Sequence, residues 1–355
     1  MAPGIAGQAA AALDSLSASQ IDFIQRLPKA ELHAHLNGSI PIPTLVELLS
    51  EYESHFDPAN PKHQLPPSEI RAGIDQLQNL NLSSLNGFFG PFTAVYALIS
   101  TREATLRITR AVLSQFLDGE SPQCSYLELR TTPRGSGDMT RLEYVSAVLE
   151  EVERYPEEKA GLILSLDRRM SLDVMEECIK LAKHLKNEGR RVVGIDLCGD
   201  PAAGDINTLE PLVHMAKKAG LGITLHIAET LDNPPEESLK LLSYKPDRLG
   251  HATFLNEEAL AIVLKEKMCV ELCLTSNLLC KTVASLDAHH IRYYLKHNHP
   301  ITICTDDVLP FRNSLQAEYA LLMAQPPLGL GLSEKEVARI AQMSMESTFS
   351  TKTTK

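Results

Sequence analysis

Seven residues with metal-binding or ionisable side chains stand at the ends of apolar runs in this sequence. They are His33, His35, His226, Glu229, His251, Asp306 and Asp307. Three His and one carboxylate around an open position are typical of a catalytic zinc site, and the remaining groups suit acid–base work. Each residue alone has an ordinary explanation, such as a hydrogen-bonded core His or an Asp that begins a helix. Their common place at strand ends favours one shared partner, because buried polar groups need one.

The His33-Ala34-His35 segment carries part of this metal hypothesis. Side chains alternate along a strand, so both imidazoles would lie on one face and could share an ion. A two-metal barrel is the nearest competitor, and such barrels often bridge their metals with a Lys at the end of the fourth strand. Residues 192–199 contain no Lys, and another known zinc-site pattern, His-x-Glu followed by Pro-Cys-x-x-Cys, is absent. The sequence therefore favours a single metal.

Eight apolar, β-branched runs are the elements that must position these side chains. The runs are Glu31–Leu36, Tyr126–Thr131, Gly161–Leu166, Val192–Leu197, Ile223–Ile227, Arg248–Gly250, Cys269–Leu274 and Ile301–Cys304. Most are continuous rather than alternating, as strands buried on both faces should be. Amphipathic segments between them predict helices at Ser171–Lys186, Thr208–Lys218, Glu236–Ser243, Asn256–Lys265 and Leu286–His297.

This alternation predicts a (β/α)8 TIM barrel, whose active site lies at the C-terminal ends of its strands. The long first connection, residues 38–123, is expected to be a mostly helical insertion over the barrel mouth. We expect residues 20–355 to form one domain. Residues 1–19 are rich in Ala, Ser and Gly, and we expect them to be a flexible leader before a helix around Ile21–Arg26.

The composition limits the possible partners of the chain. Its 355 residues carry a net charge of −11, which argues against binding a nucleic-acid polymer but permits a small anion held by a few local cations. Seven scattered Cys predict reduced, buried thiols, and no segment resembles a membrane span or a signal peptide. We therefore expect a cytoplasmic protein, a monomer, without a membrane partner.

Seven segments resemble the adenosine deaminase family of amidohydrolases, in that family's order and over nearly the whole chain. They are Leu27–Ser39, Tyr126–Arg134, Gly194–Pro201, His226–Glu229, Arg248–His251, Leu274–Asn277 and Cys304–Asp307. The resemblance implies one zinc per chain, held by His33, His35, His226 and Asp306. It also implies that Glu229 protonates purine N1 and that His251 orients and deprotonates the attacking water. Gly199, Asp307 and His35 are implied to contact the substrate.

Within the family, the sequence resembles the adenosine deaminase-like branch that acts on N6-methyl-AMP. Nucleoside deaminases usually have Asp where this chain has Asn37, and a neutral amide can donate to a phosphate that a carboxylate would repel. Tyr96 aligns where members often have a His. The branch also implies substrate contacts from the tips of two further strands: Thr131, Thr132, Pro133, Arg134 and Asp167, with cations from Arg168 and Arg169.

The expected function is thus zinc-dependent hydrolytic deamination of a 6-aminopurine nucleotide, with N6-methyl-AMP giving IMP and methylamine. An adenosine or adenine deaminase is one alternative, against which Asn37 and the Arg-bearing tips argue. A catalytically inactive purine-binding protein is another. Such a protein would be expected to have lost Glu229, His251 or a metal ligand, and all of them are present.

Overall fold

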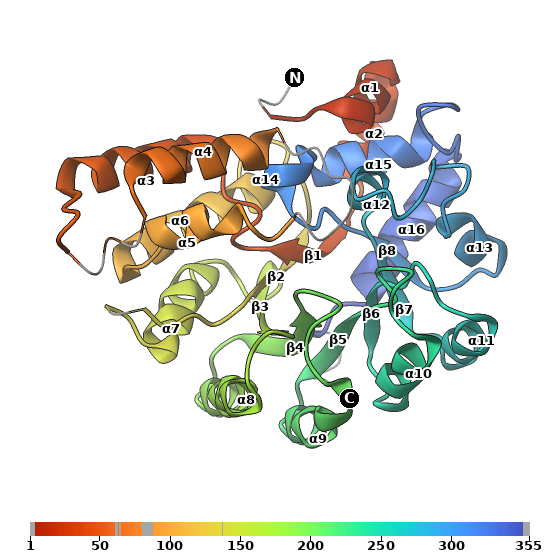
Figure 1. Cartoon of the computed structure of the whole chain (residues 1–355). Helices are drawn as coiled ribbons and strands as arrows, with labels where there is room; N and C mark the ends of the chain where they lie inside the picture. The colour runs from red at the N-terminus through yellow and green to blue at the C-terminus, as the bar shows by residue number, and fades with distance from the viewer. Residues whose placement is uncertain (1–3, 61–62, 64, 80–87, 137, 351–355) are drawn as a thin grey trace.

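The computed structural model describes residues 4–60, 63, 65–79, 88–136 and 138–350 and has the predicted barrel architecture (Figure 1). Eight strands lie side by side in chain order, and each pairs in parallel with the next. The strands are β1 (Ala30–His35), β2 (Tyr126–Thr131), β3 (Ala160–Asp167), β4 (Val192–Cys198), β5 (Gly222–Ile227), β6 (Arg248–His251), β7 (Cys269–Leu272) and β8 (Ile301–Ile303). The fold prediction is therefore confirmed.

The closure of the barrel between β8 and β1 uses side chains as well as backbone. One parallel bridge joins Ala34 to Asp306, and the Asp306 N–H donates to the His33 carbonyl at 2.8 Å. The buried Glu31 carboxylate accepts from the His33 N–H at 2.8 Å and from the Thr305 N–H at 2.9 Å. These bonds hold two of the proposed metal ligands, His33 and Asp306, on adjacent strands.

Helices surround the strands, and four of them form the predicted insertion after β1 (Figure 1). The insertion contains α3 (Ile42–His55), α4 (Pro67–Gln78), α5 (Phe92–Leu98) and α6 (Arg102–Leu117). Further helices among the described residues are α2 (Ala18–Arg26), α7 (Arg141–Val152), α8 (Leu172–Asn187), α9 (Glu210–Lys218), α10 (Pro235–Ser243), α11 (Glu257–Glu266), α12 (Leu274–Leu279), α13 (Ile291–Lys296), α14 (Val308–Phe311), α15 (Leu315–Met323) and α16 (Glu334–Glu346), with a 3₁₀ turn η2 (Ile206–Thr208).

Two elements have boundaries that differ from those predicted from the sequence. The strand predicted to continue to Leu274 ends at Leu272, because helix α12 begins at Leu274. The Thr275 N–H of α12 donates to the buried Glu318 carboxylate at 3.3 Å. The helix predicted from Leu286 begins only at Ile291, whose N–H donates to His289 Nδ1 at 3.0 Å. In both places a buried side chain accepts a hydrogen bond from a backbone N–H at the start of the helix.

The N-terminal segment contains a helix that the sequence analysis did not predict. Residues Gly7–Ser15 form helix α1, which packs against α15 (Figure 1). Ala9 and Ala12 are buried in this contact, and the Ala6 N–H donates to the Arg312 carbonyl at 2.8 Å. Small Ala side chains let two helices approach closely, so the composition that looked like a linker serves packing. The division into a leader and one domain of residues 20–355 stays a prediction.

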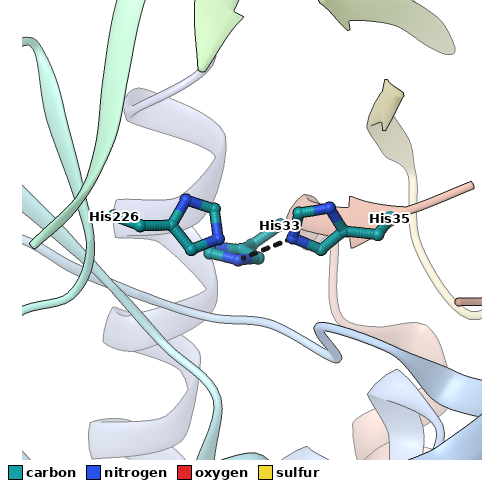
Figure 2. Close-up of side chains that lie close together, drawn as sticks. All are labelled: His33, His35 and His226. Atoms are coloured by element: carbon teal, nitrogen blue, oxygen red, sulfur yellow. Dashed lines mark hydrogen bonds between the residues drawn. The ribbon is translucent and has the colours of Figure 1, made fainter. Parts of the chain in front are cut away.

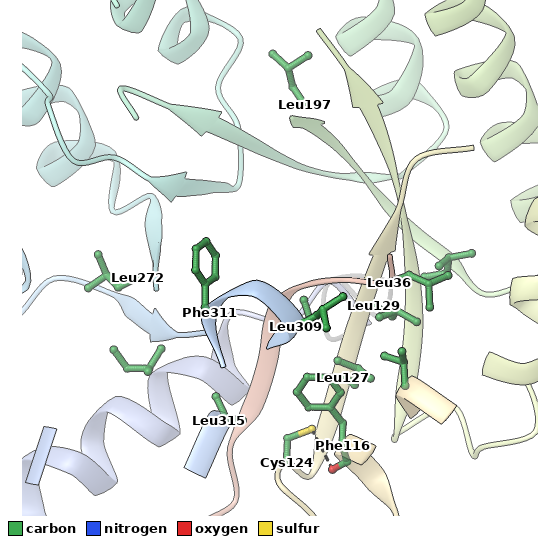
Figure 3. Packing of buried hydrophobic residues seen from close by; sticks show 14 of the residues in the cluster. Leu36, Phe116, Cys124, Leu127, Leu129, Leu197, Leu272, Leu309, Phe311 and Leu315 are labelled. Carbon is green, nitrogen blue, oxygen red and sulfur yellow. Dashed lines mark hydrogen bonds between the residues drawn. The ribbon is translucent and has the colours of Figure 1, made fainter. Parts of the chain in front are cut away.

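A continuous apolar core joins the strands to the surrounding helices (Figure 3). Leu127 and Leu129 of β2 are fully buried, as is Phe116 of α6. The seven Cys are free and buried, as predicted. Among the described residues, no helix combines the length and the apolar character needed to cross a membrane.

Candidate active site

A cavity of about 890 Å³ opens at the C-terminal ends of the strands, where barrel active sites lie. This volume includes space at the mouth that is open to solvent. Besides Arg169, twelve residues that the sequence analysis assigned to the site line the cavity: His35, Asn37, Tyr96, Thr131, Thr132, Asp167, Gly199, His226, Glu229, His251, Asp306 and Asp307.

Four assigned residues do not line the cavity: His33, Pro133, Arg134 and Arg168. His33 is fully buried, but its Nε2 lies within 4.8 Å of the ligand atoms of His35 and His226. Pro133 is buried in the tip that follows β2. The Arg134 guanidinium stacks on the Tyr96 ring, 3.4 Å from its centroid, so it stands behind the cavity wall rather than in it.

Three imidazoles converge from two strands (Figure 2). His33 and His35 come from β1, and their Nε2 atoms lie 3.3 Å apart; His226 comes from β5. The ring centroid of His33 is 4.5 Å from that of His226. Oδ1 of Asp306 is 3.6 Å from Nε2 of both His33 and His35.

Buried carboxylates fix the orientation of two of these rings. His33 Nδ1 donates to Glu271 Oε2 at 2.6 Å, and His226 Nδ1 donates to Asp196 Oδ1 at 2.9 Å. Because a carboxylate accepts, Nδ1 of each ring carries a proton, and Nε2 is the atom that faces the shared space. Carboxylate partners of this kind orient metal-binding His residues in general.

Arginines beneath the site keep these carboxylates charged. Glu271 accepts from Arg130 at 2.8 Å and from Arg248 at 2.7 Å, and all three side chains are buried. Burial disfavours its charge, but the two guanidinium groups outweigh burial and hold the pKa of Glu271 well below its usual value. Burial also opposes the charge on Asp196, yet His226 and Arg130 lower its pKa to about 2.

The pKa values of the imidazoles also depend on two opposing effects, burial and the charge of nearby groups. Burial lowers the pKa of His33 well below its usual value and that of His35 to about 3, so both rings are neutral. Burial also disfavours charge on His226, but the Asp196 carboxylate prevails and raises its pKa to about 9. His226 thus lies where positive charge is stabilised.

The geometry of the cluster fits one metal ion. Two nitrogens bound tetrahedrally to zinc at about 2.0–2.1 Å lie about 3.3 Å apart, which matches the separation of the two β1 imidazole nitrogens. The donor set, three imidazoles and one carboxylate, suits a divalent metal ion with a position left for water. Burial, and then the adjacent Asp306 carboxylate, raise the pKa of Asp307, which also favours a cation beside this pair.

Two further groups, His251 and Glu229, face the same space, and their ligand atoms lie within 4.8 Å of that of His226. His251 Nε2 lies 3.6 Å from Glu229 Oε1 and 3.8 Å from Asp306 Oδ2, and the Glu229 side chain is 11% exposed. Both are suitably placed to exchange protons with a molecule in the cavity. The backbone turns sharply at Ala228, His251 and Asp306, each with a positive φ.

Glycines allow close approach at two points of the cavity wall. A Cβ on Gly38 would lie 1.4 Å from Asp307 Oδ1, so only glycine leaves room for that carboxylate. Gly199 has a φ of +94°, and a Cβ there would meet Asp167 Oδ1 at 2.5 Å. The backbone around Gly199 is therefore accessible from the cavity in a way that another residue would prevent.

The groups assigned to a phosphate differ in their surroundings. Asn37 is almost buried beside the Tyr144 hydroxyl, which also bonds Thr131 Oγ1 at 2.7 Å. Arg169 lines the cavity and pairs with Asp167. Arg168 points elsewhere, because it pairs with Glu237 at 2.9 Å and donates to the Ala203 carbonyl at 3.0 Å. Its role is structural.

Sequence reasoning missed the carboxylates beneath the metal cluster and part of the cavity wall. Asp196, Glu271 and Arg130 each interrupt an otherwise apolar strand, and a charged residue inside such a run is the signal that could have identified them. Phe88 and Phe311 also form part of the cavity wall, and their stacked ring centroids are 5.3 Å apart. This contact had no such signal, because it joins two segments that are far apart in the sequence, α14 and the insertion.

Comparison with known proteins gives a consistent family. The family model described as adenosine deaminase matches residues 28–355. An Arabidopsis thaliana protein named N6-mAMP deaminase is 35% identical over 93% of this chain and 94% of its own length. A human protein named N6-methyl-AMP deaminase is 37% identical over 84% of this chain and 83% of its own length.

Solved structures agree with these relatives. An Arabidopsis homologue crystallised with IMP superimposes with a TM-score of 0.81 at 35% identity, over 92% of this chain and 94% of the homologue. The adenine deaminase of Arthrobacter aurescens, at 22% identity, has a TM-score of 0.74 over 91% of this chain and 94% of its own, and shares the fold.

Proposed function

This chain belongs to the adenosine deaminase family, and we propose that it hydrolytically removes the N6 amino group from a purine nucleotide, namely methylamine from N6-methyl-AMP to give IMP. The convergence of three imidazoles, two of them oriented by carboxylates, one further carboxylate and the neighbouring His251–Glu229 pair on one cavity carries this proposal. The identity with relatives named N6-methyl-AMP deaminases supports the choice of substrate.

We assign the metal as zinc, one per chain, held by His33, His35, His226 and Asp306. A bound zinc ion would supply Lewis-acid activation of water, lowering its pKa to about 7.

The chain's own residues would move the protons. His251 orients the attacking water and takes its proton, because its Nε2 faces the Asp306 side of the cluster. Attack at purine C6 shifts electron density onto N1, so a proton donor must face N1, and Glu229 is assigned that role. The proton that His251 took from water then passes to the leaving nitrogen. As the carbon–nitrogen bond breaks, the C6 hydroxyl loses its proton to form the carbonyl, and that proton restores Glu229.

The other cavity residues would hold the purine and its phosphate. The backbone at Gly199 and the Asp307 side chain are assigned to the ring, with Tyr96 as a further donor. Asn37 is assigned to the 5′-phosphate with Thr131 and Thr132, because neutral donors at that wall do not repel an anion. Pro133 and Arg134 would support that wall, since Arg134 stacks on Tyr96.

The location and assembly state are also proposals. Seven free buried thiols suit a reducing compartment, so the cytoplasm is the proposed location. We propose that the enzyme acts as a monomer on a small nucleotide, with no nucleic-acid or membrane partner.

A spectroscopic screen of purines with and without the 5′-phosphate tests the proposal, alongside elemental analysis of the purified protein. N6-methyl-AMP should be turned over with a higher kcat/KM than N6-methyladenosine, adenosine or adenine, by a protein that contains about one zinc per chain. Preference for a nucleoside would instead support the adenosine deaminase alternative. Absence of turnover by the zinc-loaded protein would favour a purine-binding protein.

A further inference from the structure

The backbone that carries His251 has an unusual conformation. His251 and Ala252, at the end of β6, have φ values of 60° and 50°. Two consecutive non-glycine residues in the left-handed region are uncommon, and such conformations persist only where surrounding contacts hold them. The direction of the His251 ring toward Glu229 depends on this turn.

His290 holds that turn from behind. Its Nε2 donates to the His251 carbonyl at 2.9 Å. A carbonyl only accepts, so the proton of His290 is on Nε2. The His290 ring stacks on His289, with centroids 4.3 Å apart and an interplanar angle of 13°. Neither ring lines the cavity, so any effect on the reaction passes through His251.

His289 is itself held at both ring nitrogens. Its Nδ1 accepts from the Ile291 N–H at 3.0 Å, and its Nε2 donates to Asn277 Oδ1 at 3.1 Å. The Asn277 amide donates in turn to Thr282 Oγ1 at 3.0 Å. Asn277 and Thr282 are part of the cavity wall. The two rings are thus bonded to the wall on one side and to the His251 backbone on the other.

We propose that His290, braced by His289, is a positioning residue for the deamination step: it holds the His251 backbone so that the His251 ring stays directed at the reacting water. The inference rests on the function proposed above. Burial lowers the pKa of both rings, that of His290 to about 4, so they remain neutral and their donor atoms stay fixed at neutral pH. This neutrality supports the fixed geometry.

His299 provides a matched control at the opposite end of the barrel. His299 is buried, whereas His290 is half-buried, but its Nε2 likewise donates to a backbone carbonyl, that of Met268, at 2.7 Å, and it too packs against Tyr294. Met268 precedes β7 and does not line the cavity. His299→Phe therefore removes the same kind of bond and keeps a ring, without affecting the His251 turn.

Steady-state kinetics of zinc-loaded His290→Phe and His299→Phe on N6-methyl-AMP test the proposal. We expect His290→Phe to lower kcat by roughly tenfold to a hundredfold with KM within about twofold, because small misplacements of catalytic groups have effects of that size. We expect His299→Phe to keep the wild-type kcat, with a similar loss of thermal stability. Equal kcat values in the two variants, with zinc retained, would overturn the proposal.

A second pair tests the inference should His290→Phe fail to fold. Gln can place an amide N–H near the position of His Nε2, whereas Asn is too short. His290→Gln should therefore keep most of the wild-type kcat, and His290→Asn should lose it; equal rates would overturn the positioning role. If wild type fails to turn over any purine, the proposed function fails instead. A crystal structure then decides: His251 should leave the left-handed region in His290→Asn but not in His299→Phe, and an unchanged turn would refute the positioning.

Discussion

Replacement of Asp196 should weaken metal binding although Asp196 does not itself face the metal cluster. Its fully buried carboxylate accepts from His226 Nδ1 at 2.9 Å and so turns Nε2 of that ring toward the cluster. Asp196 also accepts from Ser165 Oγ at 2.9 Å, while the nearby Arg130 remains paired to Glu271. The variants Asp196→Asn and Asp196→Ala therefore remove the partner of one ligand and leave the four ligands in place.

The expected size follows from the type of bond lost. A hydrogen bond to a charged group contributes about 1.5–3 kcal/mol, and a neutral acceptor gives roughly half of that. Asp196→Asn keeps an acceptor oxygen but loses its charge, so zinc affinity should fall by roughly tenfold. Asp196→Ala loses the whole bond, and affinity should fall by roughly tenfold to a hundredfold, within the range known for such outer partners.

Competition with a chromogenic zinc chelator measures these affinities, and thermal unfolding of the same samples separates metal loss from unfolding. Ser165→Ala is the control, because it removes the other hydrogen bond to Asp196 and leaves His226 untouched. Wild-type zinc affinity in folded Asp196→Ala would refute the reasoning. So would an equal loss of affinity in Ser165→Ala.

Three further changes test separate parts of the site and the fold. Glu229→Gln should retain zinc and lower kcat by roughly a hundredfold or more, because an amide cannot protonate N1; loss of zinc in this variant would mean that Glu229 holds metal. Asn37→Asp should lower kcat/KM for N6-methyl-AMP by roughly two decades, since like charges about 4 Å apart repel by about 4 kcal/mol at an effective dielectric of 20. The kcat/KM for the nucleoside, which has no phosphate, should not fall. An equal fall for both substrates, with zinc retained, would mean that Asn37 does not contact the phosphate. Burial raises the pKa of Glu318 to about 7 from a usual 4.5, so the folded protein binds this proton more tightly than the unfolded chain does. The contribution of Glu318 to the free energy of unfolding should therefore fall as pH rises between those values, by about 1.4 kcal/mol per pH unit. Glu318→Gln lacks this titration, and chemical unfolding at pH 5 and pH 7 should show it gaining on wild type; a constant difference between the two proteins would contradict this.

The sequence was sufficient to predict the barrel, because eight continuous apolar runs alternate with amphipathic segments and the active-site residues follow the runs. The sequence also predicted that the twelve lining residues would lie together, since the C-terminal ends of parallel strands share one face of a barrel. The N-terminal helix was missed because Ala-rich segments look alike whether they pack against α15 or not. Contacts between distant segments, such as His290 with the His251 carbonyl, have no local pattern to reveal them.

The central claim, hydrolytic removal of the N6 group from a nucleotide, is tested most directly by the products formed from N6-methyl-AMP in 18O-enriched water. Mass spectrometry should find IMP with one 18O atom at the purine C6 position, and equimolar methylamine, released by the zinc-loaded wild-type protein and not by Glu229→Gln. Unchanged N6-methyl-AMP, or 18O-labelled product from N6-methyladenosine alone, would contradict the account.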